Sequence, residues 1–320
     1  ILFKEIIEVD ERTNSNGEVL SSINVNTLAQ KLKTIRKRGI TSAAVVFMHS
    51  YLNPSNELLV EKIAKKVGFE HISLSHKVAK TVRFVSRGET TCVDAYLTPI
   101  LRAYISKLSK RLPEVPIEFM QSHGGLVSAH LFSGKNSVLS GPAGGVVGTA
   151  RTAEKNSRKS VIGFDMGGTS TDVCHYAGQY ERQFENEVNG VKLNIPMMAI
   201  ETVAAGGGSV VDFDGVNMRV GPESAGSNPG PACYKKGGPL TVTDCNVLLG
   251  KIRPGYFPKT FGVNNKQEID IAEVIKKFES LTRAINDSSD TDMSSEDVAE
   301  GFLQIAVSKM ADAIRKISTQ

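Results

Sequence analysis

The chain has 320 residues, which is more than one typical domain, so two domains are expected. Its net charge is only +4, and its basic clusters, KTIRKRG and AKK, alternate with aliphatic residues at helical spacing. Such clusters are typical of solvated helix faces rather than of a nucleic-acid footprint, so we expect no nucleic-acid partner. No apolar run reaches the roughly 18 residues that span a bilayer, and no secretory signal stands at the front, so no membrane partner is expected either.

The cysteines indicate a reducing compartment. None of the four is spaced as in metal sites or redox dithiols: Cys92, Cys174, Cys233 and Cys245. Scattered thiols in a chain of this size favour free cysteines and a cytoplasmic protein.

The first part of the chain alternates strand and helix patterns. After a strand-like opening stretch, NTLAQKLKTIRKRG places leucine and isoleucine on one face and ends in Gly39, which predicts a capped amphipathic helix. Short strands are expected at TSAAVVFMHS, HISLSHKV and IEFMQSHGG. Helices are expected at NELLVEKIAKKVG and at ETTCVDAYLTPILRAYISKLSKRL, the second interrupted by Pro99. This alternation favours an α/β fold with a mixed or parallel sheet.

The composition changes near Ser140, where SGPAGGVVGTARTAEKN is rich in glycine and then turns helical. We therefore predict two domains, residues 1–138 and 139–320. A glycine-rich middle follows, and two helices close the chain. Ser294 and Asp297 predict a capping box that opens the last helix. The buried stripe of that helix is expected to comprise Phe302, Ile305, Met310, Ile314 and Ile317.

The segment VIGFDMGGTSTDV (residues 161–173) contains the residues best suited to chemistry. An apolar strand ends in Asp165, and Gly167 and Gly168 let backbone N–H groups come very close to a ligand because no Cβ stands in the way. Consecutive amides with hydroxyls nearby suit phosphate oxygens, and a carboxylate at the strand end can hold Mg²⁺ through water. The segment therefore predicts a site for phosphate and a metal ion.

Two better-known phosphate loops do not fit this segment. The P-loop needs a lysine after its glycines, and the dinucleotide fingerprint needs a helix that opens at the third glycine. Here Thr-Ser-Thr-Asp-Val continues as a strand. A strand–turn–strand with the ligand at the turn remains, beside the alternative that the glycines only provide the backbone angles of a tight hairpin.

The histidines do not indicate a metal site. No two of them have metal-ligand spacing such as H-E-x-x-H. His49 ends a buried strand, where a hydrogen-bonded residue at the rim is expected. His123 lies in a glycine turn and is the first histidine to mutate.

The glycine segments resemble those of the actin-like ATPase superfamily, which includes sugar kinases and heat-shock chaperones. Asp-x-Gly-Gly-Thr-x-Thr-Asp after a hydrophobic strand resembles its second phosphate loop. SGPAGGVVGTA resembles the glycine-bearing helix before that loop, and AAGGGSVVDFDG resembles another glycine turn that approaches the phosphates. The resemblance implies a two-lobed, actin-like (ribonuclease H-like) α/β fold, present here in part.

A longer set of segments is similar, in order and spacing, to the hydantoinase A and 5-oxoprolinase family: AYLTPILRAYI, QSHGGL, LSGPAGGVVG, GFDMGGTSTDV, TVAAGGGS and GPESAGSNPGPACY. This resemblance covers nearly the whole chain. It implies ATP-dependent opening of the cyclic amide 5-oxo-L-proline to L-glutamate, with release of ADP and phosphate. ATP and Mg²⁺ are the implied cofactors, the partner is a small-molecule substrate, and a homodimer is compatible with it.

The resemblance also implies site residues. Asp165 and Asp172 would be the catalytic acids that orient Mg²⁺ or water, and Asp165 would be the metal-holding group. Asp244 is a candidate supporting acid, with a helix N-cap as the alternative reading, while Glu223 and Ser224 receive no role. The residues implied to form the nucleotide site are Gly167, Gly168, Thr169, Ser170, Thr171, Gly144, Gly145, Gly206, Gly207 and Gly208. Gly144 and Gly145 would act by letting helices pack closely, and the last three by supplying further amides.

Three departures from the family pattern shape the expectation. Full-length members open with another Asp-Gly-Gly-Thr loop, and they carry a later glycine-rich turn that receives adenine; the sequence from Ile1 to Gln320 contains neither. His123 stands where relatives more often have an acid or amide. We therefore expect a fragment that binds nucleotide weakly and turns over little. The alternatives are an N-methylhydantoinase or ketone carboxylase subunit, a nucleotide-switched chaperone-like protein, or an inactive homologue.

Overall fold

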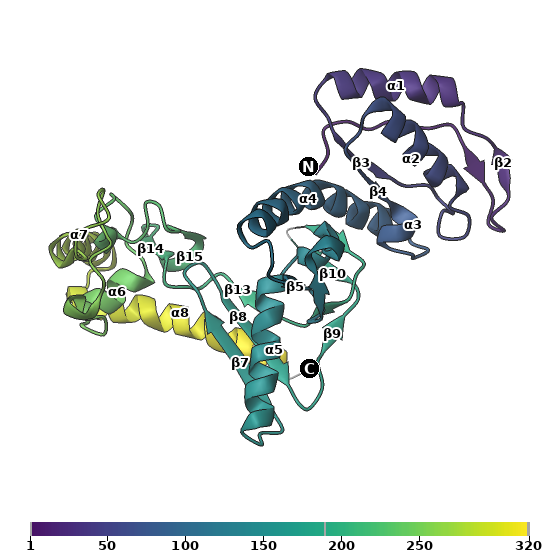
Figure 1. The fold of residues 1–320 in the computed structure, drawn as a ribbon. Helices are drawn as coiled ribbons and strands as arrows, with labels where there is room; N and C mark the ends of the chain where they lie inside the picture. The colour runs from purple at the N-terminus through teal and green to yellow at the C-terminus, as the bar shows by residue number, and fades with distance from the viewer. Residues whose placement is uncertain (1, 189, 319–320) are drawn as a thin grey trace. The chain divides into compact units, whose positions relative to one another are not determined.

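The computed structural model describes residues 2–188 and 190–318. These residues form two compact units (Figure 1). Unit 1 combines Ile1–Val147 with Tyr180–Ala199, and unit 2 combines Gly148–Gln179 with Ile200–Gln320. The chain therefore leaves unit 1 inside a helix, after Val147, returns to it at Tyr180 and leaves it again after Ala199. The sequence instead predicts a single boundary after residue 138.

Unit 1 is a mixed α/β unit. Its helices are α1 (Val25–Lys37), α2 (Ser55–Val67), α3 (Ser75–Val78), α4 (Phe84–Arg111) and the first half of α5 (Ser140–Lys155), with short 3₁₀ turns η1 (Ala129–Leu131) and η2 (Gly134–Ser137). Its strands are β1 (Arg12–Thr13), β2 (Val19–Ser21), β3 (Ser42–Val45), β4 (His71–Leu74), β5 (Glu118–Met120), β6 (Leu126–Ser128), β9 (Arg182–Gln183), β10 (Asn186–Val188), β11 (Val191–Leu193) and β12 (Met197–Met198). The pairing of β3 with β4 is parallel, and the other strand pairs are antiparallel. This is the mixed pattern that the sequence favours.

Helices α1 and α2 cover the β3–β4 pair because their apolar stripes face it. Leu28 and Leu32 of α1 pack with Val60 and Ile63 of α2 in one core. The predicted glycine end of α1 is confirmed, since Gly39 adopts a left-handed backbone with φ of 85°. The amphipathic pattern therefore placed these helices correctly.

Helix α4 continues through Pro99, whereas the sequence predicts an interruption there. Proline lacks an N–H and leaves the carbonyl four residues earlier without its helical partner. In the structure Ser42 Oγ donates to that carbonyl, of Ala95, at 2.6 Å. A neighbouring strand thus supplies the missing hydrogen bond, so the helix need not end.

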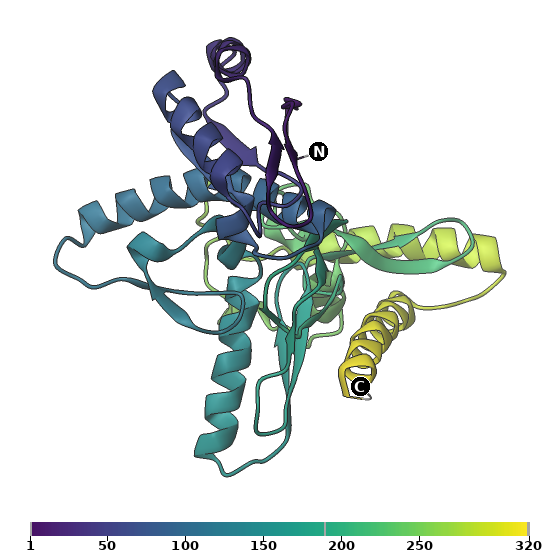
Figure 2. The same cartoon turned by 90° about the vertical axis from the view of Figure 1, so that its right-hand side faces the viewer.

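Unit 2 contains the second half of α5, a three-stranded antiparallel sheet and a helical layer. The sheet order is β13–β8–β7, with β7 (Val161–Met166), β8 (Thr171–Tyr176) and β13 (Glu201–Val203). The remaining elements are β14 (Ser209–Phe213), β15 (Met218–Ser224), η3 (Ala232–Tyr234), α6 (Val242–Leu248), η4 (Pro254–Tyr256), α7 (Ile271–Ser289) and α8 (Ser295–Ser318). Strand β7 runs beside the second half of α5 (Figures 1 and 2). A methyl group added at Gly163 would lie 2.6 Å from Thr149 Oγ1.

Helix α8 joins the sheet to the helical core of unit 2. Its capping box is confirmed: Ser294 Oγ donates to Asp297 Oδ2 at 2.6 Å, and the Asp297 N–H donates back to Ser294 Oγ at 3.1 Å. Of the predicted stripe, Phe302, Met310 and Ile317 are buried. Ile305 and Ile314 are only half-buried, while Ala313 and Ile317 pack against Val173 of the sheet.

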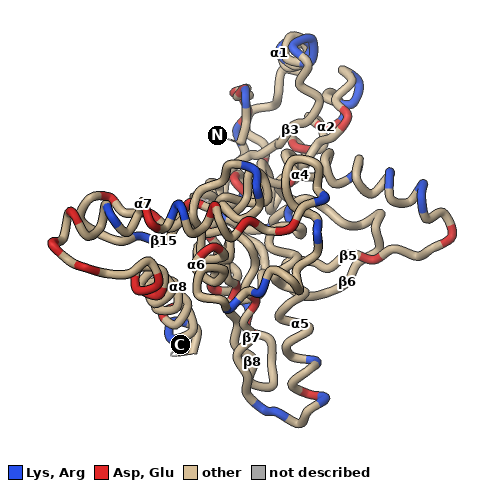
Figure 3. The backbone as a smooth tube through the Cα atoms, turned by 90° about the vertical axis from the view of Figure 1, so that its left-hand side faces the viewer, with Lys and Arg blue, Asp and Glu red and all other residues tan. Residues whose placement is uncertain are grey.

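The charges lie along many elements rather than on one basic surface. Figure 3 shows Lys and Arg spread over several helices and loops of the described chain, with Asp and Glu among them. Most ion pairs involve exposed side chains, such as Arg315 with Asp312. No helix among the described residues is both long and apolar enough to cross a bilayer.

Candidate phosphate site

The segment singled out in the sequence forms a hairpin in unit 2. Strands β7 and β8 pair antiparallel, and the turn between them closes with the Gly167 N–H donating to the Ser170 carbonyl at 2.8 Å. The predicted strand–turn–strand is therefore confirmed. Gly168 and Thr169 are exposed at its tip.

Two carboxylates share one face of this hairpin. Asp165 of β7 and Asp172 of β8 are direct partners in the ladder, and directly opposite residues of an antiparallel pair point to the same side. Thr202 Oγ1 of β13 donates to Asp172 Oδ1 at 2.6 Å, while Asp165 is exposed. Two like charges at such a position repel each other, so a cation between them would be stabilising.

The donor set around these acids fits a hydrated ion. In the described part of the chain no three His, Cys, Asp or Glu side chains gather as a metal cluster. A pair of carboxylates suits Mg²⁺, which keeps several of its waters and takes few protein ligands. Asp165 and Asp172 are thus the residues of the hairpin that could hold Mg²⁺.

A second glycine loop packs on the hairpin turn. The Gly207 N–H donates to the Gly167 carbonyl at 3.0 Å, and the Gly208 N–H donates to the Gly168 carbonyl at 2.6 Å. A methyl group added at Gly206 would lie 2.8 Å from the Gly167 carbonyl oxygen. Only glycine permits this backbone-to-backbone contact. We call the contact of Gly206–Gly208 with Gly167–Gly168 the glycine clamp.

The clamp changes the part expected of the second loop. From the family resemblance, Gly206, Gly207 and Gly208 are predicted to supply amides to a phosphate. In the structure the Gly206 N–H donates to Ser209 Oγ at 2.8 Å, and the other two donate to the first loop. The N–H groups of Gly168 and Thr169 make no hydrogen bond within the described residues. The donors open to an anion therefore lie in the first turn, and direct contact of the second loop with a nucleotide stays a prediction.

Of the three predicted hydroxyls, two can face a ligand and one cannot. Thr169 is exposed and Ser170 is half-buried, so both can face a ligand. Thr171 is fully buried and donates to the Ala205 carbonyl at 2.6 Å. Its hydroxyl therefore joins β8 to the second loop instead of facing the turn opening.

The two predicted helix glycines belong to another part of the structure. Gly144 and Gly145 lie in α5, in the portion that belongs to unit 1, whereas the hairpin belongs to unit 2. A methyl at Gly144 would meet Met120 Cγ at 3.8 Å, an ordinary contact distance. Nothing among the described residues requires glycine at 144, and the role of both positions stays a prediction.

Two segments that the sequence left without a role hold the clamp from behind. The Ala225 N–H donates to the Gly208 carbonyl at 2.8 Å, and Ser224 Oγ does so at 3.2 Å. The Thr243 N–H and Oγ1 each lie 2.8 Å from the Gly207 carbonyl. Ser224 thus gains a place in the site, and Thr243 is a residue that sequence reasoning missed. No local pattern could have found it, because its partner lies 36 positions away.

Asp244 is a structural acid. It is fully buried at the third position of α6, forms a capping box with Thr241, and accepts from the Ala232 N–H at 3.0 Å and the Cys233 N–H at 2.8 Å. Asp244 is thus not the N-cap that the alternative reading proposed: Thr241 is the N-cap, and Asp244 supports it from the third helical position. Burial, and then the Asp244 charge, raise the pKa of the Cys233 thiol well above its usual range. That thiol stays protonated and unreactive.

His123 holds its own turn in unit 1. Its Nε2 lies 2.9 Å from Gln121 Oε1, and its Nδ1 accepts from the Gly125 N–H at 3.2 Å. The His123 carbonyl accepts from Arg182 Nε at 3.2 Å. Both ring nitrogens are thus engaged locally, which gives the residue a structural part.

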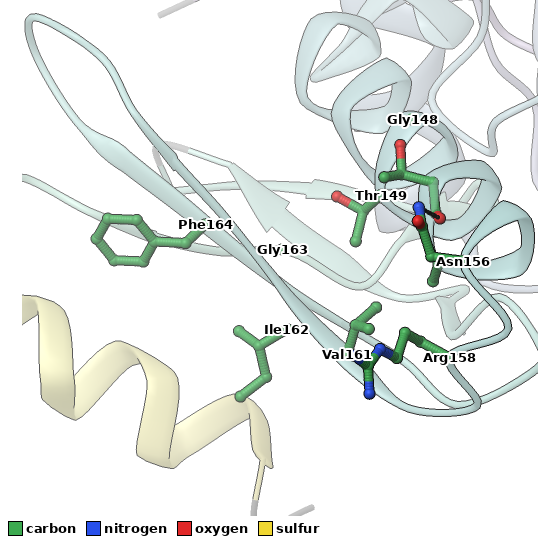
Figure 4. Close-up of a pocket in the computed structure, with 10 residues that line it drawn as sticks. Gly148, Thr149, Asn156, Arg158, Val161, Ile162, Gly163 and Phe164 are labelled. Carbon is green, nitrogen blue, oxygen red and sulfur yellow. Dashed lines mark hydrogen bonds between the residues drawn. The ribbon is translucent and has the colours of Figure 1, made fainter.

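A shallow cleft of about 420 Å³ lies between α5 and β7. Figure 4 shows Arg158 and Asn156 at its polar end and Phe164 away from them. Neither the hairpin turn nor Asp165 lines this cleft. The phosphate donors therefore lie outside it.

Comparisons with known proteins agree on one family. A family model described as Hydantoinase/oxoprolinase matches residues 87–320, and one for the Hydantoinase/oxoprolinase N-terminal region matches residues 1–68. The chain belongs to the hydantoinase/oxoprolinase family. The predicted resemblance is confirmed.

Several relatives are called 5-oxoprolinases. The chain is 45% identical to 5-oxoprolinase 1 of Arabidopsis thaliana over 99% of its own length and 27% of the relative. It is 45% identical to the 5-oxoprolinase of Saccharomyces cerevisiae over 90% of its length and 23% of that protein. The chain thus spans about a quarter of the length of these relatives.

Two solved structures resemble the fold. A nucleotide-free acetone carboxylase matches 97% of this chain and 44% of its own, with a TM-score of 0.79 and 26% identity. An ATP-dependent caprolactamase from Pseudomonas jessenii matches 97% and 45%, with a TM-score of 0.72 and 28% identity. The predicted class, an α/β fold that is part of an actin-like ATPase, is confirmed.

Proposed function

We propose that this chain is the ATPase portion of a 5-oxoprolinase, which opens 5-oxo-L-proline to L-glutamate with release of ADP and phosphate. The observation that carries the proposal is the hairpin turn, where two free N–H groups lie beside a pair of opposed carboxylates. The relatives called 5-oxoprolinase, at 41–45% identity, support the choice of substrate. Because the chain spans only a fraction of their length, the activity is proposed for the complete gene product that contains it.

The reaction needs ATP because a five-membered lactam is a poor electrophile. Transfer of the γ-phosphoryl group to the amide oxygen makes the ring carbon electrophilic. Water adds there, and the carbon–nitrogen bond breaks as the nitrogen takes a proton, which leaves an acyl phosphate. A second water hydrolyses the acyl phosphate to the carboxylate and releases phosphate. Catalysis of such a transfer consists mainly of positioning and charge stabilisation.

The hairpin residues divide these tasks. The N–H groups of Gly168 and Thr169 bind phosphate oxygens, and the hydroxyls of Thr169 and Ser170 lie beside them. Asp165 would hold Mg²⁺, and Asp172, whose carboxylate accepts from Thr202 Oγ1, would orient a water. Mg²⁺, when bound, neutralises charge on the phosphates. His123, engaged in its own turn, has no part in this scheme.

The thiols support a cellular setting. Among the described residues, Cys92, Cys174, Cys233 and Cys245 form no disulfide, and unpaired cysteines of this kind in a protein of this size are typical of a reducing compartment. We therefore place the protein in the cytoplasm, with a small cyclic amide as its partner. A homodimer is the assembly to test first.

The decisive experiment compares Asp165→Asn with wild type in the complete gene product. We expect magnesium-dependent ATP hydrolysis that 5-oxoproline stimulates, and a fall of about 10- to 100-fold in the variant, the usual effect of losing a group that orients a metal's ligands. Asp312→Asn, an exposed acid on α8, is the matched control and keeps full activity.

Three outcomes contradict the proposal in different ways. Hydrolysis indifferent to 5-oxoproline but stimulated by N-methylhydantoin would keep the phosphate site and replace the substrate. An Asp165→Asn variant with wild-type activity would remove the hairpin from the reaction. Stimulation by an unfolded polypeptide instead of a small lactam would favour the chaperone-like alternative.

A further inference from the structure

The glycine clamp forms part of an ordered chain of peptide groups. Thr243, at the second position of α6, donates from both its N–H and its Oγ1 to the Gly207 carbonyl. The next N–H along the backbone, of Gly208, donates to the Gly168 carbonyl at 2.6 Å. The next N–H after that carbonyl belongs to Thr169, and it is free and exposed.

Because peptide groups are planar, this series of hydrogen bonds fixes the direction of each N–H group in it. The bonds from Gly207 to Gly208 and from Gly168 to Thr169 are trans, so the C=O and N–H of each peptide point in opposite directions. Fixing the Gly207 carbonyl toward Thr243 therefore aims the Gly208 N–H at Gly168. Fixing the Gly168 carbonyl toward Gly208 in turn aims the Thr169 N–H away from the clamp.

The neighbouring peptide, between Gly167 and Gly168, is oriented in the same way. The Gly207 N–H holds the Gly167 carbonyl, which turns the Gly168 N–H away from the second loop. Both free amides of the turn thus point to its open side. The second glycine loop therefore acts on the anion site by orienting these two amides.

Thr243 is the side chain with the most direct hold on this arrangement. Two donors from one residue converge on the Gly207 carbonyl, whereas the Gly208 carbonyl is held by the Ala225 N–H and by a longer bond from Ser224 Oγ, at 3.2 Å. Hydrogen bonds in series polarise one another. A hydroxyl at the start of the chain therefore also strengthens the donor at its end.

We propose that Thr243 is a positioning residue for the transferred phosphoryl group, acting through Gly208 and Gly168 on the Thr169 N–H. This inference rests on the proposed function and adds a residue that touches neither nucleotide nor metal. Charge on phosphate oxygens is redistributed during transfer. The Thr243 hydroxyl is therefore expected to affect turnover more than substrate binding.

The test uses Thr243→Val and Thr243→Ser in the complete gene product. Valine keeps the shape and the backbone N–H but removes the hydroxyl, and serine restores it. We expect Thr243→Val to lower kcat for ATP hydrolysis about three- to tenfold, the factor that one neutral hydrogen bond corresponds to. The KM for 5-oxoproline stays unchanged, and Thr243→Ser recovers most of the loss.

Thr282→Val is the matched control. Thr282 lies in α7 of the same unit, is nearly buried, and donates to Ser295 Oγ at 3.2 Å, within the helical layer. It reports what the loss of a buried threonine hydroxyl does to melting temperature and rate in general. The rate with Thr282→Val stays at the wild-type value.

The outcomes separate this inference from the proposed function. Wild-type kcat in Thr243→Val, or equal losses in Thr243→Ser and Thr243→Val, would overturn the role of the Thr243 hydroxyl. Neither result would contradict the proposed reaction on 5-oxoproline. If wild type hydrolyses ATP without any response to 5-oxoproline, the substrate proposal fails while the Thr243 effect is still read on ATP alone. A wild type that neither binds nor hydrolyses ATP overturns both.

Discussion

A buried charged cluster in unit 1 and the glycine clamp in unit 2 both fix loops, by opposite means. In unit 1 the side chains do it: Glu57 and Arg87 are fully buried, and Ser75 Oγ lies between them, 2.5 Å from Glu57 Oε1 and 3.0 Å from Arg87 Nε. In unit 2 the contacts are mostly between backbone groups, and glycine keeps side chains out of the way.

The two arrangements differ in whether they leave hydrogen-bonding groups available to a ligand. The Nε and both terminal nitrogens of Arg87 donate to acceptors inside the protein, which are Ser75 Oγ and the carbonyls of Phe47, Met48, Thr81 and Val82. Glu57 accepts in the same closed way from Ser75 and His76. The clamp instead turns two N–H groups outward. A closed polar cluster serves stability, and an open one can bind a ligand.

The largest expected effect is on stability, from breaking the closed cluster. Ser75 Oγ links Arg87 to the Glu57 carboxylate. Arg87→Met removes the buried cation of this cluster, and removing one charge from a buried set of opposite charges costs about 3–5 kcal/mol. We expect a loss of that size in the free energy of opening, read from hydrogen exchange of peptides in α2 and α4 under increasing urea.

The control for this variant is Arg36→Met, since Arg36 pairs with Glu70 at an exposed position, 3.2 Å apart. Such pairs contribute about 0–1 kcal/mol. Equal small losses for both arginines would mean that the Glu57–Arg87 cluster is not buried in the working protein.

The next largest effect is on catalysis, from breaking the open arrangement. Gly206→Ala puts a methyl 2.8 Å from the Gly167 carbonyl oxygen and from the Ser170 nitrogen, so the turn must shift. Displacing a catalytic group by about 1 Å can cost on the order of 100-fold in rate. We expect that loss in ATP hydrolysis.

Gly255→Ala is the control, because a methyl there meets nothing within 4 Å. It should leave the rate unchanged. A Gly206→Ala enzyme as fast as wild type would show that the two glycine loops separate during turnover. The glycine clamp would then not be the arrangement that orients the two amides.

Some of these features could be predicted from the sequence, and others could not. Local signals sufficed for the hairpin around Gly167, for the capping box at Ser294 and for the glycine end of α1, because each is decided by residues within a few positions. They failed at Pro99, where a strand residue distant in sequence, Ser42, supplies the missing donor. They also failed at Thr243, whose role depends on a loop 36 positions earlier.

The same limit applies to the domain division and to the second glycine loop. Residues 180–199 return to unit 1 with no change in composition to announce it, because tertiary pairing decides where a segment packs. Proximity of the two glycine loops was predictable from the family resemblance. That Gly207 and Gly208 donate to the first loop was not, since the direction of a peptide N–H is set by long-range contacts.

The smallest expected effect concerns a second closed cluster in unit 1 and sharpens the comparison through pH. His71 Nε2 lies 2.9 Å from Ser73 Oγ, which donates to Asp94 Oδ2 at 2.7 Å. Burial lowers the pKa of His71, partly offset by the Asp94 charge, while Arg102 lowers it further. The folded state therefore binds fewer protons at this residue than the unfolded state. The stability from neutral His71 is present above the unfolded pKa, about 6.5, and is lost as the pH falls below it.

His71→Gln removes this contribution. One proton changes stability by at most about 1.4 kcal/mol per pH unit, so we expect a shallower fall of the unfolding free energy between about pH 7 and 5, by less than that amount. His130→Gln, at an exposed position, should leave the slope as it is. If both variants keep the wild-type slope, His71 does not titrate differently in the folded state. The cluster of His71, Ser73 and Asp94 would then add nothing to the pH dependence of stability.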